Sequence, residues 1–252
     1  MMKQQLELPN GEVVRYAIRR SARARNIRLT LGPRDGLMVV APQGVSLDAV
    51  TALVAGKASW VARHMARQAT RHAQSVAERA CHPGSIRLPA LGESWRVQYL
   101  PSSSHTVRAR TSGTAQILVL GPKEPAAGAH AALRGWLVER ARKTLPPWLD
   151  RLAASAGWSY AQVAIRNQRS RWGSCSARGH ISLNCKLLFL PPDLVDYVLW
   201  HELCHLHELN HSARFWQLLR RVQPHSDPLR QRLRTAWETI PAWAHAPSKS
   251  DP

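Results

Sequence analysis

The stretch His201-Glu202-Leu203-Cys204-His205, followed by His211, decides how the rest of this chain is interpreted. Because an α-helix advances about 100° per residue, side chains four positions apart lie on one face. His201 and His205 can therefore both direct a ring nitrogen at one metal ion, while Glu202 falls beside that ion. The pattern predicts a helix that carries two metal ligands and one catalytic carboxylate.

His211 is the candidate third ligand, because the three histidines have the spacing of zincins whose third ligand follows a turn. His207 and Glu208 are rival candidates for the third ligand. Their helical phase carries them off the face that His201 and His205 share, so we rank both below His211.

The chain must turn between the second and third histidines. In the extended motif a glycine stands three residues after the second histidine, whereas this chain has Glu208 there. We expect Asn210 to end the helix in the left-handed conformation and Ser212 to be the N-cap of the next helix. This arrangement would bring His211 back towards the other two histidines.

The chemistry of this donor set is that of a catalytic zinc site. Three protein ligands leave the fourth tetrahedral position of one zinc ion open, and zinc lowers the pKa of a bound water from 15.7 to about 7. Glu202 is the candidate general base for that water. Imidazole also suits other first-row metals, so zinc is an expectation based on its common use.

A β-hairpin is predicted directly before the motif helix, with strands at 170–175 and 181–184 and a turn at 177–179. Several short motifs in and after it resemble those of one family. They are Arg171-Trp172-Gly173-Ser174-Cys175, Asn184, Tyr197-Val198, the stretch from His201 to Leu206, and Asn210-His211-Ser212 with Phe215-Trp216.

On these residues the chain resembles the YgjP-like metallopeptidases, which are relatives of the WLM and SprT-type zincins. The similarity covers roughly residues 130–235, and a weaker one extends from Arg28 to Gly92. The resemblance implies a minimal zincin domain in which His201, His205 and His211 bind zinc and Glu202 is the catalytic base. Pro146-Pro147 departs from the family, which has a continuous helix there, and predicts a break or kink.

We expect an α+β fold. Residues 1–125 are predicted to form an N-terminal β-rich region with a long helix, residues 126–245 a zincin-like metallopeptidase domain with a small antiparallel sheet, and residues 246–252 a disordered tail. The long helix is predicted to start after an N-cap at Ser46 and to run through Met65. The N-terminal strands are predicted at 13–18, 27–31, 37–41, 95–100, 107–109 and 117–120, and no internal repeat is evident.

Composition agrees with a cytoplasmic enzyme. The chain has 252 residues, of which 44% are hydrophobic, enough for a substantial core. It has no apolar run of 18 residues and no secretory signal, so no membrane association is expected. The four cysteines form no CxxC pair and are expected to be buried thiols. A second metal site that includes Cys175, Cys185 and Cys204 is an alternative.

The formal net charge of +19 would attract polyanions. Arginines cluster near the first hairpins and in the last helices, so non-specific binding of nucleic acid through this basic surface is possible on charge alone. We favour the simpler interpretation that most of these arginines are solvated.

Three functions are therefore considered. The first is a zinc peptidase acting on a peptide or protein substrate. The second is a phosphoanhydride hydrolase with the same metal centre, in which arginines ahead of the motif offset the charge of a nucleotide. The third is a nucleic-acid or ribosome-associated protein with a structural zinc. The cations considered for the phosphoanhydride hydrolase are Arg166, Arg169, Arg171 and Lys186.

The residues around the site are given auxiliary roles. Tyr197 lies one turn before His201 and is a candidate to stabilise an oxyanion. Asn184 and Arg171 are candidates to contact the substrate or to hydrogen-bond a residue that binds the metal. A peptidase also needs an edge strand beside the metal, and the strands with Ser174 or Ile181 are the candidates.

Overall fold

The computed structural model describes residues 2–22, 24–32, 36–66, 82–122 and 126–245. The chain divides into two compact units, Met1–Ala77 and Glu78–Pro252. The boundary expected near residue 125 falls inside the second unit, and the tail expected at 246–252 lies outside the described residues. No helix in the described segments is both long and apolar enough to span a bilayer.

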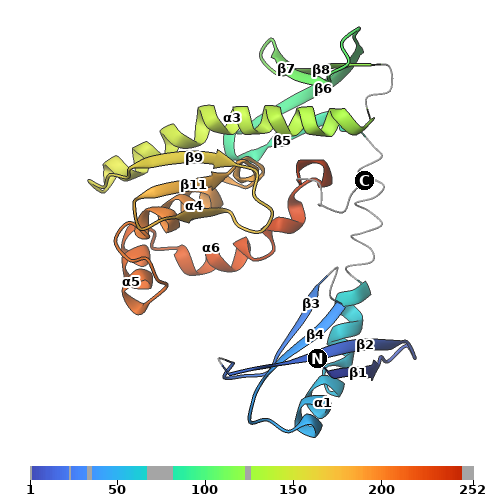
Figure 1. The fold of residues 1–252 in the computed structure, drawn as a ribbon. Coiled ribbons are helices and arrows are strands. Elements are labelled where there is room, and N and C mark those ends of the chain that lie inside the picture. The colour runs from blue at the N-terminus through green and yellow to red at the C-terminus, as the bar shows by residue number, and fades with distance from the viewer. Residues whose placement is uncertain (1, 23, 33–35, 67–81, 123–125, 246–252) are drawn as a thin grey trace. The chain divides into compact units, whose positions relative to one another are not determined.

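The first unit is a four-stranded sheet followed by a helix (Figure 1). Its strands are β1 (Met2–Glu7), β2 (Val13–Ser21), β3 (Arg28–Gly32) and β4 (Gly36–Pro42), in the order β1-β2-β4-β3. β3–β4 is an antiparallel hairpin of two predicted strands, β1–β2 is a second antiparallel hairpin, and β2 runs parallel to β4. The sequence patterns did not predict β1.

The helix of the first unit starts where predicted. The Ser46 hydroxyl accepts a hydrogen bond from the Ala49 amide at 3.2 Å and caps α1 (Leu47–Ala55). The prediction of one helix through Met65 was wrong in one respect: α1 ends at Ala55 with Gly56 as its C-cap, and helical residues resume at 58–66. Glycine has a low helix propensity because it loses the most backbone entropy, which accounts for an interruption there.

The second unit begins with another four-stranded sheet. Its strands are β5 (Ser85–Leu88), β6 (Glu93–Pro101), β7 (Arg108–Ser112) and β8 (Gln116–Gly121), in the order β5-β6-β8-β7. The two outer pairs are antiparallel hairpins and the central pair is parallel. This is the strand order and pairing of the first unit.

The two sheets therefore form a structural repeat, which corrects the expectation that the chain has none. Val39 and Val119 occupy equivalent central positions, since Val39 pairs with Leu29 and Val119 pairs with Ala109. Leu37 and Ile117 are equivalent as well, because each is buried and takes the same place in the parallel strand pair of its own sheet. Few side chains are identical at these positions, so the repeat is visible in pairing and burial rather than in residue type.

Helix α3 (Ala126–Ser155) packs against both sheets of the second unit (Figure 1). Of the break or kink predicted at Pro146-Pro147, a break does not occur, because both prolines lie inside this helix. Leu145 and Leu149 on either side of them are completely buried. Burial of these leucines offsets the cost of the backbone hydrogen bonds that the prolines remove.

The remainder of the second unit has the predicted hairpin and motif helix. The strands β9 (Gln162–Arg166), β10 (Gly173–Cys175) and β11 (His180–Asn184) form a sheet in the order β10-β11-β9. The prediction that this sheet is antiparallel was wrong for one pair, because β11 runs parallel to β9. The helices that follow are α4 (Pro192–Cys204), α5 (Ala213–Val222) and α6 (Ser226–Leu233).

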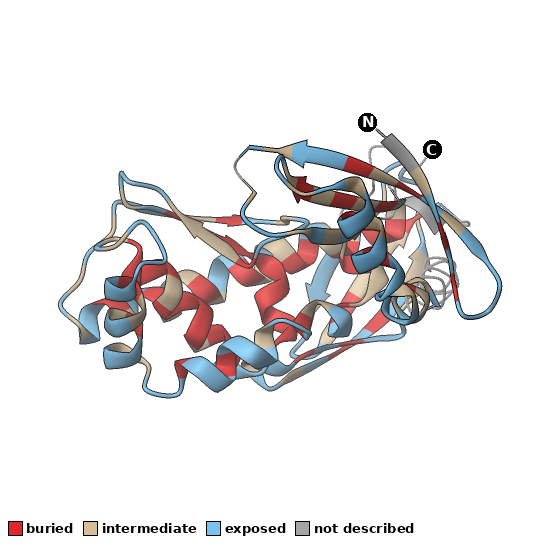
Figure 2. Ribbon diagram, turned by 90° about the horizontal axis from the view of Figure 1, so that it is seen from below, coloured by how far each residue is buried: buried red, intermediate tan, exposed pale blue. Residues whose placement is uncertain are grey.

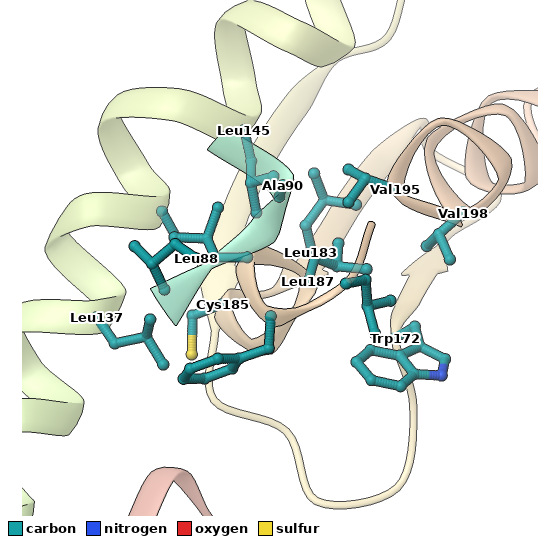
Figure 3. Packing of buried hydrophobic residues seen from close by; sticks show 14 of the residues in the cluster. Leu88, Ala90, Leu137, Leu145, Trp172, Leu183, Cys185, Leu187, Val195 and Val198 are labelled. Carbon is teal, nitrogen blue, oxygen red and sulfur yellow. The ribbon is translucent and has the colours of Figure 1, made fainter. Parts of the chain in front are cut away.

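One apolar cluster unites the second unit, and buried residues line its helices (Figure 2). Leu183 from β11 and Leu187 from the following 3-10 turn pack near Val195 and Val198 of α4 (Figure 3). This packing holds the sheet and α4 together, so the fold is α+β as expected and places β10 beside the histidine motif.

Candidate metal centre

The motif helix carries two of the predicted groups and ends at the third. His201 and Glu202 lie in α4, whereas His205 is its C-cap with φ −66° and ψ −13°. The chain leaves the helix through hydrogen bonds from the Leu206 amide to the Leu203 carbonyl and from the His207 amide to the Cys204 carbonyl.

The turn to His211 differs from the prediction at one residue. No non-glycine residue in the described segments has positive φ, so the left-handed conformation expected for Asn210 was wrong. The amide of Ser212 instead donates to the Asn210 carbonyl at 2.7 Å. Ser212 is the predicted N-cap of α5, because its hydroxyl accepts a hydrogen bond from the Phe215 amide.

The structure brings the three predicted ligands together. One ligand atom from each of His201, His205 and His211 lies within 4.8 Å of the others. The Nε2 atoms of His201 and His211 are 3.0 Å apart. The rival His207 packs instead against Trp158, with ring centroids 4.6 Å apart.

Backbone and aromatic contacts orient the imidazoles. Nδ1 of His205 lies 2.9 Å from the Glu208 carbonyl, which can only accept, so this nitrogen carries the proton and Nε2 is free to bind a metal. The Phe215 ring stacks on His205 at 4.6 Å, and the Trp216 ring stacks on His211 at 5.5 Å. His205 is thus held in the tautomer that a metal bound at Nε2 requires.

Burial keeps His201 and His211 neutral. It lowers the pKa of His201 to about 3, with smaller contributions from His205, His211 and Arg230. Burial also lowers the pKa of His211, with further contributions from His205 and Arg230. Since only a neutral imidazole has a lone pair for a metal, these rings are in the ligand form at neutral pH.

Glu202 is buried beside this cluster and is 4% exposed. Burial raises the pKa of its carboxyl to about 8, although the nearby Arg171 charge opposes the shift. Its Oε2 atom has no hydrogen-bond partner. Gly173 of β10 leaves space for the carboxyl group, because a β-carbon there would lie 2.5 Å from Oε1.

These observations fit a bound divalent metal. A buried carboxyl oxygen without a partner, such as Oε2 of Glu202, is unfavourable by itself. Three imidazoles with converging nitrogens form the donor set that zinc accepts. Within the described residues, no fourth protein group joins the cluster and none of the cysteines belongs to it.

The structure gives Asn184 a supporting position. It is completely buried, and its side-chain amide donates to the carbonyls of Gln168 and Arg171 at 2.9 and 2.8 Å. Its Oδ1 accepts from the Lys186 amide at 3.1 Å. Asn184 therefore holds the loop that leads into β10.

The other two auxiliary candidates lie near the cluster. Tyr197 is buried, its ring centroid is 6.1 Å from that of His201, and burial raises the pKa of its hydroxyl. Arg171 is exposed, and its charge acts on Glu202.

Arg230 is a residue near the site that the sequence patterns missed. Its guanidinium carbon lies 4.1 Å from the ring centroid of Trp216, which itself stacks on His211. Its charge lowers the pKa of both His201 and His211. Arg230 is 19 residues beyond His211 on α6, so no local motif connects them.

A three-histidine cluster with a buried glutamate on a short helix beside a small sheet defines a metallopeptidase-type site. The YgjP-like metallopeptidase domain family matches residues 25–236, and this chain belongs to that family. The structure of the metallopeptidase zymogen of Pyrococcus abyssi abylysin is similar over 38% of this chain and 96% of its own, with 26% identity and a TM-score of 0.35. No curated protein sequence matches the chain.

Proposed function

We propose that this chain is a zinc-dependent peptidase in which His201, His205 and His211 hold one zinc ion and Glu202 is the general base. The observation that carries the proposal is the position of a buried carboxyl group beside three converging imidazoles. Zinc bound there supplies a Lewis acid that acidifies a water and polarises a carbonyl group.

Glu202 would accept the proton of the attacking water and pass it to the leaving amine. Its elevated pKa suits both steps, because a base with a pKa near the working pH also returns its proton readily. A cation held by the histidines would lower that pKa and favour the carboxylate. For both steps the carboxyl group of Glu202 must remain in the space that Gly173 leaves for it.

β10 is the candidate strand for binding an extended peptide. It is an edge strand of its three-stranded sheet, and Gly173 at its start adjoins Glu202. A substrate strand that pairs with the free edge of β10 would pass beside the histidines. Of the two strands considered from the sequence, that with Ser174 is at the edge and that with Ile181 is central.

Arg230 is the best-placed group to stabilise the oxyanion that forms at the substrate carbonyl. Stacking on Trp216 restrains its guanidinium while leaving the residue exposed. Within the described part of the chain no carboxylate forms an ion pair with it, so its charge is available to substrate. A restrained cation beside a developing negative charge stabilises a transition state more than a ground state.

The phosphoanhydride alternative has less support. Lys186, one of its four candidate cations, is completely buried, and its ammonium group donates to the Asn167 side chain and the Gln168 carbonyl. A structural zinc would require a fourth protein ligand, which the described residues do not add to the cluster.

The test is to measure zinc content and hydrolysis of an unfolded protein by the wild type, His205→Ala and Glu202→Gln. We expect one zinc in the wild type, loss of zinc in His205→Ala, and retention of zinc without peptidase activity in Glu202→Gln. A Glu202→Gln protein that still cleaves peptides would overturn the proposal. Cleavage of nucleoside triphosphates alone would support the phosphoanhydride alternative.

A further inference from the structure

A hollow in the second unit is lined by none of the three clustered histidines, His201, His205 and His211. Its volume is about 620 Å³, within the usual range for ligand pockets. It is formed by the end of α3, by α4 with the loop after it, and by α5. The groups that define its chemistry are Trp158, Trp200, Leu218, Arg214, Arg221 and Glu208.

One wall of this hollow is apolar. Trp200 is 8% exposed, and the Trp158 ring meets it edge to face with centroids 5.7 Å apart. Trp158 and Leu218 are half-buried and still accessible. Such a wall would gain free energy by covering an aromatic or large aliphatic side chain.

Two cations stand at the rim. Arg214 and Arg221 are seven residues apart on α5, which places both on one face of the helix with Leu218 between them. Both are exposed, and neither forms an ion pair with another described residue. The adjacent Arg220 differs, because it pairs with Asp227 at 3.0 Å.

The loop beside this hollow also belongs to the metal centre. Glu208 lines the hollow, and its backbone carbonyl accepts the proton of His205 Nδ1. The same loop continues to His211. A ligand in the hollow would therefore lie against the segment that joins the second and third histidines.

We propose that this hollow binds a segment of the polypeptide substrate in which an aromatic or large aliphatic side chain is flanked by Asp or Glu. This inference rests on the proposed peptidase function. The tryptophans and Leu218 would cover the apolar side chain, and Arg214 and Arg221 would pair with the carboxylates.

The experiment measures binding of a fluorescein-labelled peptide, with one Phe between two pairs of Asp, to Glu202→Gln protein by fluorescence anisotropy. Glu202→Gln keeps the peptide intact during the measurement. We expect Arg214→Glu with Arg221→Glu in this background to weaken binding about tenfold, as the loss of two exposed charge pairs implies. Replacing the Asp residues by Asn, or Phe by Ala, should also weaken binding.

The matched control is Arg108→Glu with Arg110→Glu, two exposed arginines on β7 that do not line the hollow. It changes the net charge equally, and we expect less than a twofold effect. Equal weakening of peptide binding by the two double variants would overturn the proposal. Displacement of the peptide by an unlabelled oligothymidylate, seen only when Arg214 and Arg221 are present, would overturn it as well. Binding needs no turnover, so a wild type that cleaves nothing would refute the peptidase proposal without deciding this one.

Discussion

A β-carbon on residue 173 would lie 2.5 Å from Oε1 of Glu202 and 2.7 Å from its Cγ, so Gly173 and the carboxyl group fit together only without a side chain between them. Gly173 does not need a positive φ, since it is absent from the glycines with that conformation. Glycine is therefore required at position 173 because a side chain there would clash with the proposed base, Glu202.

Gly173→Ala should displace the Glu202 side chain while leaving the histidines in place. We expect peptide hydrolysis to fall about a hundredfold, as for small misplacements of a catalytic group, and stability to fall by about 1–3 kcal/mol. Zinc content should be unchanged. Gly135→Ala in α3 is the control, because nothing lies within 4 Å of its added β-carbon. Equal activity in the two variants would refute the role of Gly173.

Arg230→Met should lower kcat about a hundredfold, in the range seen when one oxyanion donor is removed. KM and zinc content should change little, and Arg230→Lys should recover part of kcat because it retains the charge. Arg234→Met is the control, since Arg234 lies one turn further along the chain and has no stacking partner among the described rings. A rise in KM with unchanged kcat would assign Arg230 to substrate binding instead.

Asn184→Ala should destabilise the second unit by about 3 kcal/mol, because it removes a completely buried side chain whose amide donates to the Gln168 and Arg171 carbonyls and leaves the Gln168 carbonyl only its bond from Lys186. Urea unfolding measures the loss. The exposed Asn10→Ala variant is the control and should change stability by less than about 0.5 kcal/mol. A loss of activity without a loss of stability would instead place Asn184 in contact with substrate.

Lys186 should make stability depend on alkaline pH. Burial lowers the pKa of its ammonium group to about 8 from the model-compound value of 10.5. Between these values the unfolded chain binds more protons than the folded one, so stability rises as pH increases and this gain is absent below about pH 8. The rise is about 3 kcal/mol for a shift of this size. The difference in unfolding free energy between wild type and Lys186→Met, measured from pH 7 to 10, should show it.

Removing residues 1–77 should leave a folded second unit, whereas removing residues 1–125 should not. The β5–β8 sheet is bound to α3 by the Arg140–Glu93 ion pair and by a hydrogen bond from Trp136 Nε1 to Thr111 Oγ1. The Trp95 and Trp136 rings also meet at 5.3 Å. Circular dichroism and thermal unfolding of the two truncated chains would check this, and a cooperative transition in the shorter one would contradict it.

The sequence predicted the parts of the site that depend on local spacing. The placement of His201 on a helix and of His211 after a turn follows from helical periodicity and from the capping preference of Ser212, whereas the end of the helix at His205 was not predicted. The hairpin before α4 also followed from local turn residues. These features arise within short segments, where propensity and spacing act directly.

Features that depend on distant contacts were not predicted. Arg230 reaches the centre only because α6 packs against α4, and Asn184 supports the loop into β10 only after β11 has paired. The prolines of α3 were expected to break it, but packing on two sheets overrode local preference. The repeat was missed because pairing and burial recur in it while residue types do not.

The repeated strand order also has a consequence for misfolding. A chain with two sheets of the same topology contains strands that could pair with the wrong sheet, since β4 and β8 each lie between one parallel and one antiparallel neighbour. Mispairing of this kind is a typical failure of chains with repeated modules. Differences in side chains between the copies, such as Tyr16 opposite Leu37 but Val97 opposite Ile117, would make the exchanged cores pack poorly. The divergence that hides the repeat in the sequence thereby helps each strand to find its own sheet.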